Sequence, residues 1–380
     1  MLMVGNVLTH YRLPLYEALQ ERVDLDLVLY SDGGEWYWQH AEEPGTGKLH
    51  SVEHLKGVWL GRTRVTPALA LRVAASKADV VVKDPNGKFA LSVTYFAARL
   101  TGKPFVFWAS LWEHPSGGVH RFTRPVMRLL YRKADAIVTY GHHVSRYVIE
   151  EGADPERVIV SPQAVAPRAT AVLKKERWGG TRQLLYVGRL EPWKGVSLLM
   201  QALSGVRRRD WHLKVAGEGS SEPDLRKLVA DLGLGDRVTF LGRVPNVDVH
   251  ALYAAAQFVV VPSVRTNEFS EPWALVINEA MQAGAVVVAS DAVGAVQDGL
   301  VEEGRTGFVF VAGDADALGH ALNRAMAQPA DGSRRMAAES LNSIGAFTHA
   351  AAADAFVTAA NVAIDRHSGR AARRRKAERE

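Results

Sequence analysis

The sequence predicts an α/β protein made of two doubly wound domains, each built around a parallel β-sheet. The chain of 380 residues is too long for one ordinary core, so we expect two domains of the usual size. Short apolar runs rich in β-branched residues alternate with longer amphipathic segments, which is typical of βα units around a parallel sheet. Such sheets bind ligands at the carboxyl ends of their strands, so we expect the two domains to face a cleft.

The first half of the chain supplies six predicted strands. The opening run, MLMVGNVL, is too short to span a membrane and has no basic segment before it, so we interpret it as a strand. The predicted strands are residues 1–8, 24–31, 78–84, 104–110, 136–141 and 158–163. Amphipathic segments predict helices near residues 66–77, 87–101, 124–134 and 142–151.

The second half repeats this pattern after a break. Residues 164–182 lose the periodicity and gather charge, proline and a glycine pair, which indicates a linker. The strands predicted beyond the linker are residues 183–190, 211–219, 237–244, 258–264 and 285–290. The helices predicted between these strands lie near residues 195–204, 221–233, 246–256 and 274–283.

These elements divide the chain into two domains and a C-terminal extension. We predict the domains over residues 1–163 and 183–345, on either side of the linker 164–182. A last helix is expected over residues 346–365, with an alanine-rich stripe that packs against another surface. Residues 366–380 hold seven lysines or arginines and two glutamates, and we expect this basic tail to be disordered.

The charge and the cysteine content exclude several classes of function. The tail accounts for the whole formal net charge of +5, and the other 365 residues carry 39 basic and 39 acidic groups. A neutral body is no electrostatic footprint for duplex nucleic acid, so we expect no nucleic-acid partner. The absence of cysteine excludes disulfides, thiolate metal ligands and cysteine nucleophiles, and it permits the cytoplasmic location that we expect.

The strongest motif is spread over two segments of the second half. These are LLYVGRLEPWKGV (184–196) and SEPWALVINEAMQAGAVVVASD (270–291), with Glu271 and Glu279 separated by seven residues. Here the sequence resembles the retaining family-4 glycosyltransferases, which carry a G-R-L-x-x-x-K-G stretch and two glutamates at this spacing. The resemblance continues through FLGRVPNVDVHALYAAA and VGAVQDGLVEEGRTGFVF, covers about 160 residues firmly, and extends loosely over the N-terminal half.

The resemblance implies a fold and an activity. The fold is the glycosyltransferase-B architecture, in which two Rossmann-like domains face a cleft and the terminal helix crosses back to the first domain. The activity is transfer of a sugar from a nucleoside diphosphate-sugar donor to an acceptor hydroxyl with retention of anomeric configuration. The acceptor is not readable from the sequence. No cofactor or bound metal is expected.

Arg189 and Lys194 suit the stabilisation of a diphosphate leaving group. Positive groups fixed in a dry cleft stabilise charge that develops as the bond to the anomeric carbon breaks. Arg189 follows a predicted strand, and Lys194 precedes a helix that begins near Gly195. A guanidinium, an ammonium and a helix N-terminus therefore converge on phosphate oxygens in this prediction.

Each of the two glutamates is expected to bind a different part of the donor. Pro272 suits the start of a helix, so Glu271 is expected in the loop and Glu279 further down the helix. By resemblance, Glu271 binds sugar hydroxyls and Glu279 binds the ribose diol. The backbone N–H groups at the helix N-terminus add phosphate contacts in this prediction, and they belong to Trp273, Ala274 and Leu275.

Two further segments of the second half are assigned to the donor by resemblance. Gly217 and Gly219 lie in VAGEGSSE after a predicted strand. Arg243 lies in RVTFLGRV (237–244), which is expected to flank the base. G-x-G alone is also a fragment of a dinucleotide fingerprint, but the third glycine and the ribose-binding acid of a dehydrogenase are not clearly present.

The first half adds weaker candidates. His114 follows a predicted strand at a position where the resembled family often has a cleft histidine near the sugar, although a histidine in a loop is more often structural. Tyr11 and Arg12 follow the first strand and are expected to face an acceptor. This chain lacks the family's Gly-Gly pair in that loop. It also has Ala274 where glycine is usual, and Ala285-Val286 where a residue followed by proline is usual.

A basic helix is predicted from Arg124 to Lys133. Arg124, Arg128 and Arg132 share one face, while Val126, Met127, Leu129 and Leu130 lie on another. This face is either an ordinary solvated one or a contact for anionic lipid or a phosphorylated acceptor, so peripheral membrane contact stays open.

Metal ligation and other activities are the remaining alternatives. DLD (24–26) and DAD (314–316) have the D-x-D form of metal-dependent transferases, but the first lies in a predicted strand and the second opens a helix, where Asp is an ordinary cap. The alternatives to a transferase are a nucleotide-sugar epimerase or a phosphorylase of the same architecture, and a non-catalytic adaptor that binds membranes or polyanions.

Overall fold

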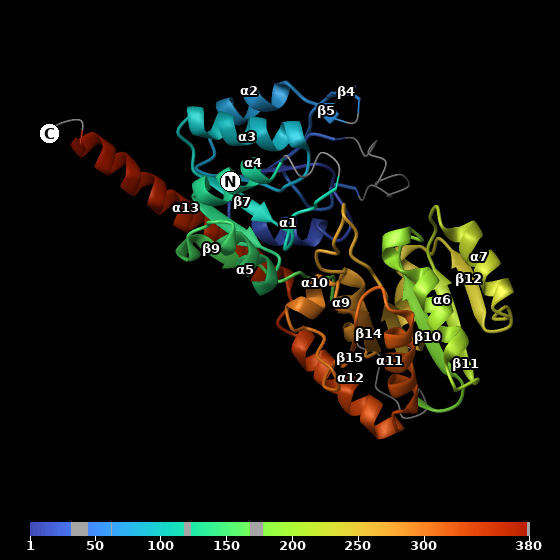
Figure 1. The fold of residues 1–380 in the computed structure, drawn as a ribbon. Coiled ribbons are helices and arrows are strands. Elements are labelled where there is room, and N and C mark those ends of the chain that lie inside the picture. The colour runs from blue at the N-terminus through green and yellow to red at the C-terminus, as the bar shows by residue number, and fades with distance from the viewer. Residues whose placement is uncertain (32–44, 62, 118–122, 168–177, 378–380) are drawn as a thin grey trace. The chain divides into compact units, whose positions relative to one another are not determined.

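The computed structural model describes residues 1–31, 45–61, 63–117, 123–167 and 178–377, with side chains described to residue 369. The chain forms two compact units, whose elements can be followed in Figure 1. The first unit comprises Met1–His114, Phe122–Ala166 and Phe347–Glu380, and the second comprises Pro115–Arg121 and Pro167–Ala346.

The first unit contains a seven-stranded parallel sheet in the order β3-β2-β1-β6-β7-β8-β9. Its central strands are buried on both faces, as the continuous apolar runs predicted. The strands are β1 (Leu2–Gly5), β2 (Asp26–Leu29), β3 (Val52–His54), β6 (Val81–Lys83), β7 (Phe105–Ala109), β8 (Ala136–Thr139) and β9 (Val158–Val160). A separate antiparallel hairpin joins β4 (Val58–Leu60) to β5 (Thr63–Val65).

Helices cover both faces of this sheet. One face packs against α1 (Leu13–Gln20) and α13 (His349–Ala377), where the ring centroids of Trp108 and Phe356 lie 4.9 Å apart. The other face packs against the remaining helices of this unit. These are α2 (Ala68–Ala75), α3 (Lys88–Leu100), α4 (Arg124–Lys133) and α5 (His142–Glu150). The predicted last helix therefore packs against the first sheet.

The predicted end of the last helix is wrong. We expected the helix to stop at residue 365 and a disordered tail to follow, but α13 continues to Ala377 (Figure 1). Residues 370–377 are alanine, arginine and lysine, which are strong helix formers, so nothing in the sequence ends the helix there. Arg366 also anchors α13, because its guanidinium pairs with Asp154 at 2.6 Å.

The second unit contains a six-stranded parallel sheet in the order β12-β11-β10-β13-β14-β15. Its strands are β10 (Arg182–Val187), β11 (Trp211–Ala216), β12 (Val238–Gly242), β13 (Phe258–Val261), β14 (Val286–Ser290) and β15 (Gly307–Phe310). Its helices are α6 (Val196–Gly205), α7 (Glu222–Asp231), α8 (Asn246–Ala255), α9 (Leu275–Gln282), α10 (Gly294–Gln297), α11 (Ala315–Ala327) and α12 (Ala330–Ile344).

The prediction of an α/β protein with two parallel sheets is confirmed, but some boundaries differ. The second unit begins before residue 183, because Trp178 is buried in its core, inside the segment that we predicted as a linker. Predicted strands extended too far at their carboxyl ends; for example, β11 ends at Ala216 because Gly217 turns the chain with φ at 146°. Among the described residues, no helix is long and apolar enough to cross a lipid bilayer.

The strand order of the second sheet locates a site. From β10 the chain proceeds to β11 and β12 on one side, and it then returns to β13, β14 and β15 on the other side. The loops that follow β10 and β13 therefore leave the sheet in opposite directions, and ligands of doubly wound sheets bind at such a switch point. These two loops contain Arg189, Lys194 and Glu271.

Candidate active site

The loops after β10 and β13 touch through their backbones. The N–H of Val264 donates to the carbonyl oxygen of Trp193 at 2.9 Å. Gly195 lies against Pro262, and a Cβ at Gly195 would overlap the Pro262 carbonyl oxygen. Gly195 also has a φ of 68°, a conformation that side chains disfavour. Glycine at this position therefore lets the Lys194 loop lie close against the second loop.

The loop after β11 joins the same place, also through glycines. A Cβ at Gly217 would overlap the carbonyl oxygen of Gly188, and one at Gly219 would overlap that of Leu190. The N–H of Gly217 donates to the carbonyl oxygen of Gly242, at the end of β12, over 2.8 Å. Gly217 and Gly219 thus lie beside the Arg189 loop, and their contact with a nucleotide stays a prediction.

Lys194 and Glu271 form an ion pair across the two loops. The side chains are 19% and 10% exposed, so the pair is largely withdrawn from water. The backbone holds Glu271 in place, because its carbonyl oxygen accepts the N–H of Gly294 at 3.0 Å. A mostly buried ammonium and carboxylate interact more strongly than a surface pair, since the medium between them is less polar than water.

Arg189 and Glu271 both lie within electrostatic reach of Tyr186. The guanidinium of Arg189 lies over the indole of Trp193, 5.6 Å from the ring centroid, and the Arg189 carbonyl oxygen accepts the hydroxyl of Tyr186 at 2.7 Å. Burial raises the pKa of Tyr186; the negative charge of Glu271 raises it further, whereas the positive charge of Arg189 lowers it. Tyr186 therefore stays protonated, and the charges of both side chains affect its pKa.

The helix that carries Glu279 is α9, which starts at Leu275, close to the start predicted near residue 274. Pro272, which suits a helix start, lies before it. Ala274 has φ at 74° and ψ at 82°, and among the described residues it is the one non-glycine with a positive φ. That left-handed conformation is incompatible with the helix, so Pro272 and Trp273 stay outside it.

The first turn of α9 is held by side chains. The buried indole N–H of Trp273 donates to the Oδ1 of Asn278 at 2.8 Å, and the carbonyl oxygen of Trp273 accepts the N–H of Ala295. Glu279 lies on the second turn, where its Oε2 accepts the hydroxyl of Tyr253 at 2.8 Å. Glu271 thus lies in the loop and Glu279 in the helix, as predicted.

Arg243 and His114 each lie beside a polar group of their own surroundings. The backbone N–H of Arg243 donates to the Oε1 of Glu218 at 3.2 Å, which puts Arg243 beside the loop after β11. His114 belongs to the first unit, and its Nε2 lies 3.5 Å from the Oγ1 of Thr123. The roles that we predicted for both side chains stay predictions.

Arg12 is largely buried in its own unit, and its contact with an acceptor stays a prediction. Its side chain is only 13% exposed, its guanidinium donates to the hydroxyl of Tyr140 at 2.7 Å, and it lies over the ring of Trp108. It also pairs with Asp84 at 3.5 Å. Arg12 is therefore held inside the first unit, at the carboxyl end of its sheet.

The arginine face of the basic helix α4 pairs with a carboxylate of its own unit, and membrane contact by this helix stays a prediction. Arg124 and Arg128 both pair with Glu151, at 2.5 and 2.7 Å. Part of the apolar face is also different from the prediction, because Val126 and Leu129 are exposed rather than buried. The arginine face is thus partly neutralised by a carboxylate of its own unit.

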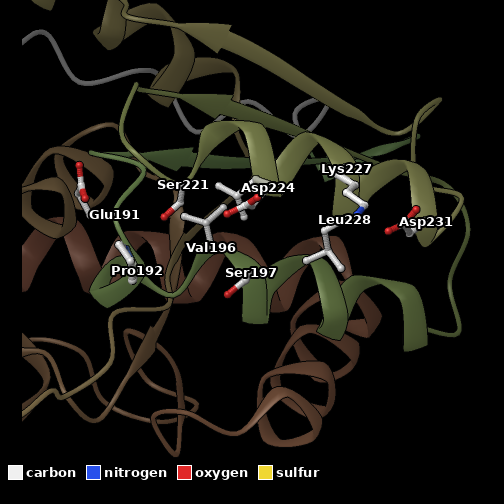
Figure 2. Close-up of a pocket in the computed structure, with 10 residues that line it drawn as sticks. Glu191, Pro192, Val196, Ser197, Ser221, Asp224, Lys227, Leu228 and Asp231 are labelled. Carbon is white, nitrogen blue, oxygen red and sulfur yellow. The ribbon is translucent and has the colours of Figure 1, made fainter.

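A groove of about 440 Å³ lies beside the site, between α6 and α7. Figure 2 shows Ser197, Ser221, Asp224 and Lys227 along this groove. None of the predicted donor residues lines it; Glu191 and Pro192, in the Arg189 loop, border one end. We therefore place the candidate active site at the switch point and not in this groove.

Sequence reasoning missed the residues that support the site. Tyr186, Tyr253 and Asn278 each form a hydrogen bond with a predicted residue or its loop. Tyr253 lies inside the resembled stretch FLGRVPNVDVHALYAAA, but no spacing rule links it to Glu279. Of the D-x-D segments, Asp314 caps α11 as predicted, and the described residues contain no group of three or more His, Asp or Glu that could hold a metal.

Two domain families match the chain. The family described as glycosyl transferases group 1 matches residues 170–342, and the family described as glycosyl transferase 4-like domain matches residues 8–164. The first match covers most of the second unit, and the other lies within the N-terminal half. The two matches meet near the predicted linker.

Curated relatives carry glycosyltransferase names. The D-inositol 3-phosphate glycosyltransferase of Pseudarthrobacter chlorophenolicus is 34% identical over 269 residues, which are 66% of this chain and 60% of that protein. The alpha-D-kanosaminyltransferase of Streptomyces kanamyceticus is 30% identical over 255 residues, which are 62% of this chain and 64% of that protein. The chain thus spans about three fifths of the length of these relatives.

Solved structures share the fold. The Anabaena protein HepE, solved in complex with UDP and glucose, superposes with a TM-score of 0.71 at 22% identity, over 94% of this chain and 98% of that one. The sucrose-phosphate synthase of Thermosynechococcus elongatus superposes with a TM-score of 0.70 at 18% identity, over 94% and 97%. At these identities the likeness establishes the fold.

Proposed function

Because this chain belongs to the family-4-like glycosyltransferases with the glycosyltransferase-B fold, we propose that it moves a sugar from a nucleoside diphosphate-sugar to an acceptor hydroxyl. The anomeric configuration is retained in this proposal. A sugar-nucleotide donor carries two ribose hydroxyls, a diphosphate and a sugar. The second unit therefore has to present one group for each of these parts.

The observation that carries the proposal is the ion pair of Lys194 and Glu271, in which Lys194 belongs to the same loop as Arg189. A departing diphosphate is stabilised most by cations that are already fixed in a partly dry site. Lys194 is mostly buried, whereas Arg189 is exposed and lies over the indole of Trp193, which limits the motion of its guanidinium. We assign both to the diphosphate, with Glu271 released to the sugar hydroxyls when the donor binds.

The start of α9 is assigned to the phosphates and the ribose. The first N–H groups of a helix have no carbonyl partner within the helix, and the positive end of the helix dipole favours an anion there. We propose that Ala274 and Leu275 supply such N–H groups, and that the N–H of Trp273, just before the helix, adds a further phosphate contact. Glu279 lies four residues beyond Leu275, about 6 Å along the axis, and would accept the ribose hydroxyls.

The reaction requires no further acid or base from the protein in this proposal. The bond from the anomeric carbon to the phosphate oxygen breaks, and the acceptor oxygen bonds to the same face of that carbon. The proton of the acceptor hydroxyl goes to the departing phosphate oxygen. Arg189 and Lys194 carry the positive charge that a metal ion carries in metal-dependent transferases, so neither a metal nor a cofactor is proposed.

The structural neighbours guide the choice of donor. HepE was solved with UDP and with UDP-glucose, which supports uridine nucleotides as the first donors to test. We assign acceptor binding to the first unit, where His114 would contribute a hydrogen bond near the reacting sugar. The identity of the acceptor is not part of the proposal.

Nucleoside diphosphate release tests the proposal. The purified chain is incubated with a panel of nucleotide-sugars, with and without pooled acceptors, and the released diphosphate is measured. We expect release from at least one donor, and a loss of at least about 100-fold in Arg189→Ala and Lys194→Ala, because each removes a cation from the leaving group.

A lysine outside the site provides the matched control. Lys227 lines the groove between α6 and α7, so Lys227→Ala should keep full activity. Thermal melting checks that all variants fold. An active Arg189→Ala/Lys194→Ala double variant would overturn the assignment of the leaving-group cations, and product analysis without acceptor separates transfer from epimerisation.

A further inference from the structure

Tyr253 connects α8 to the candidate ribose ligand. Its side chain comes from the last turns of α8 (Asn246–Ala255) and is 1% exposed. Its hydroxyl donates to the Oε2 of Glu279 over 2.8 Å, and Glu279 belongs to the neighbouring helix α9. A buried ring from one helix therefore holds one carboxylate oxygen of a half-buried glutamate on another.

We propose that Tyr253 is a specificity-determining positioning residue that makes the site select ribose over 2′-deoxyribose. The inference rests on the proposed function, because it needs Glu279 to receive the ribose hydroxyls. Tyr253 itself touches no substrate in this proposal. It acts through the orientation of the Glu279 carboxylate.

The hydrogen bond from Tyr253 limits the freedom of motion of the Glu279 side chain. A glutamate side chain has several rotatable bonds, and ordering it when a ligand binds costs free energy. A hydroxyl that donates to an ionised carboxylate makes a charge-assisted hydrogen bond, which is stronger than a neutral one. Tyr253 therefore fixes Glu279 before the nucleotide arrives, and the ribose meets a carboxylate that is already oriented.

An oriented Glu279 carboxylate also discriminates between ribose and 2′-deoxyribose. A site built to hydrogen-bond a hydroxyl rejects the analogue that lacks the hydroxyl, because the polar group of the site is then left unsatisfied. The penalty is large only if the carboxylate cannot turn away to water. Glu279 is half-buried and tied to Tyr253, so it pays that penalty with a deoxyribose ligand.

The test compares ribose and deoxyribose nucleotides. Calorimetry measures the Kd of UDP, ADP and GDP, and of their 2′-deoxy forms, with the wild-type full chain. We expect the wild type to bind the ribose form of its preferred base at least about tenfold more tightly than the deoxy form. Glu279→Ala should abolish that ratio.

Tyr253→Phe removes only the hydroxyl and keeps the buried ring. We expect the ratio to fall at least about threefold, through weaker ribose binding with unchanged deoxyribose binding. Adding Tyr253→Phe to Glu279→Ala should cause no further loss, since Tyr253 acts through Glu279. A merely structural tyrosine would weaken both nucleotides alike and leave the ratio unchanged.

Tyr131→Phe is the matched control. Tyr131 is fully buried in the first unit, and its hydroxyl has no hydrogen-bond partner among the described residues, so its loss should change neither Kd. A wild-type ratio that survives in Tyr253→Phe would overturn this inference alone. Failure of the wild type to bind any of the six nucleotides would overturn the proposed function, and this inference with it.

Discussion

Lys194 and Glu271, 77 residues apart in the sequence, form an ion pair where the chain reverses its direction across the second sheet. The pair joins a cation that we assign to a phosphate and a carboxylate that we assign to a sugar. Without a ligand, the charge of each side chain is therefore balanced by the other. A nucleoside diphosphate without its sugar replaces only the partner of Lys194, and it leaves Glu271 with a negative charge beside the phosphate.

This arrangement predicts opposite effects of Glu271→Gln on binding and on transfer. The variant should bind free UDP about fivefold more tightly, because the carboxylate no longer competes for Lys194 or repels the phosphate. Transfer should fall, because the sugar hydroxyls lose the charged carboxylate to which they donate hydrogen bonds. Calorimetry and diphosphate release measure the two effects.

Glu222→Gln serves as the control for that experiment, since the Glu222 carboxylate pairs with Arg226 on its own helix α7 and is not assigned to the donor. It should leave both quantities unchanged. Weaker UDP binding in Glu271→Gln would contradict the competition between the carboxylate and the phosphate.

Gly195 and Gly233 form a matched pair for a prediction about loop packing. Both have a left-handed backbone, with φ at 68° and 63°, so alanine costs each about 1–2 kcal/mol of conformational energy. A Cβ at Gly195 would also overlap the Pro262 carbonyl oxygen, whereas one at Gly233 meets nothing within 4 Å. Chemical denaturation should therefore show Gly195→Ala to be less stable than Gly233→Ala by about 1–3 kcal/mol. Equal losses would mean that the two loops do not touch.

The left-handed backbone of Ala274 leads us to expect that replacing this residue by glycine stabilises the protein. Its left-handed conformation strains any residue with a Cβ, so Ala274→Gly should raise the free energy of unfolding by up to about 1 kcal/mol. Ala280→Gly, in the interior of α9, should lower it by about that amount or more. Urea denaturation of the two variants compares them, and destabilisation by Ala274→Gly would contradict the strained conformation.

His349, at the start of α13, predicts a dependence of stability on pH. Burial lowers the pKa of His349 below its ordinary value of 6.5. The unfolded chain then binds a proton at a higher pH than the folded chain, so stability is full above pH 6.5 and falls as the pH decreases from there toward the lower folded pKa. His349→Asn should lose less of its melting temperature between pH 7.5 and pH 5.5 than the wild type loses.

The exposed His54, at the end of β3, supplies the control for this pH series. His54→Asn should follow the wild-type profile. An unchanged pH dependence in His349→Asn would show that burial of this imidazole does not contribute to acid sensitivity.

The sequence predicted the features that depend on local pattern. Buried parallel strands are written as uninterrupted apolar runs, such as VVVAS at residues 286–290, so the two sheets could be foreseen. The approach of Lys194 to Glu271 follows from the same pattern, since loops at the carboxyl ends of neighbouring parallel strands meet. The glycines of these loops were recognised as part of a motif, and the structure adds the backbone contacts that require them.

The features that depend on distant partners were not predictable. Tyr253 reaches Glu279 from another helix, and no spacing in the sequence signals that hydrogen bond. Arg12 follows a predicted strand, but nothing in the sequence signals its hydrogen bond to Tyr140, more than a hundred residues away. Ala274 gives no local signal of a left-handed backbone, because alanine normally favours a helix.

A crystal structure of the full chain with bound UDP shows where the diphosphate binds. We expect diphosphate oxygens within hydrogen-bond distance of the Lys194 ammonium and the Arg189 guanidinium, with the ribose hydroxyls on Glu279. A diphosphate that instead lies in the groove between α6 and α7, with Lys194 still paired to Glu271, would contradict this expectation.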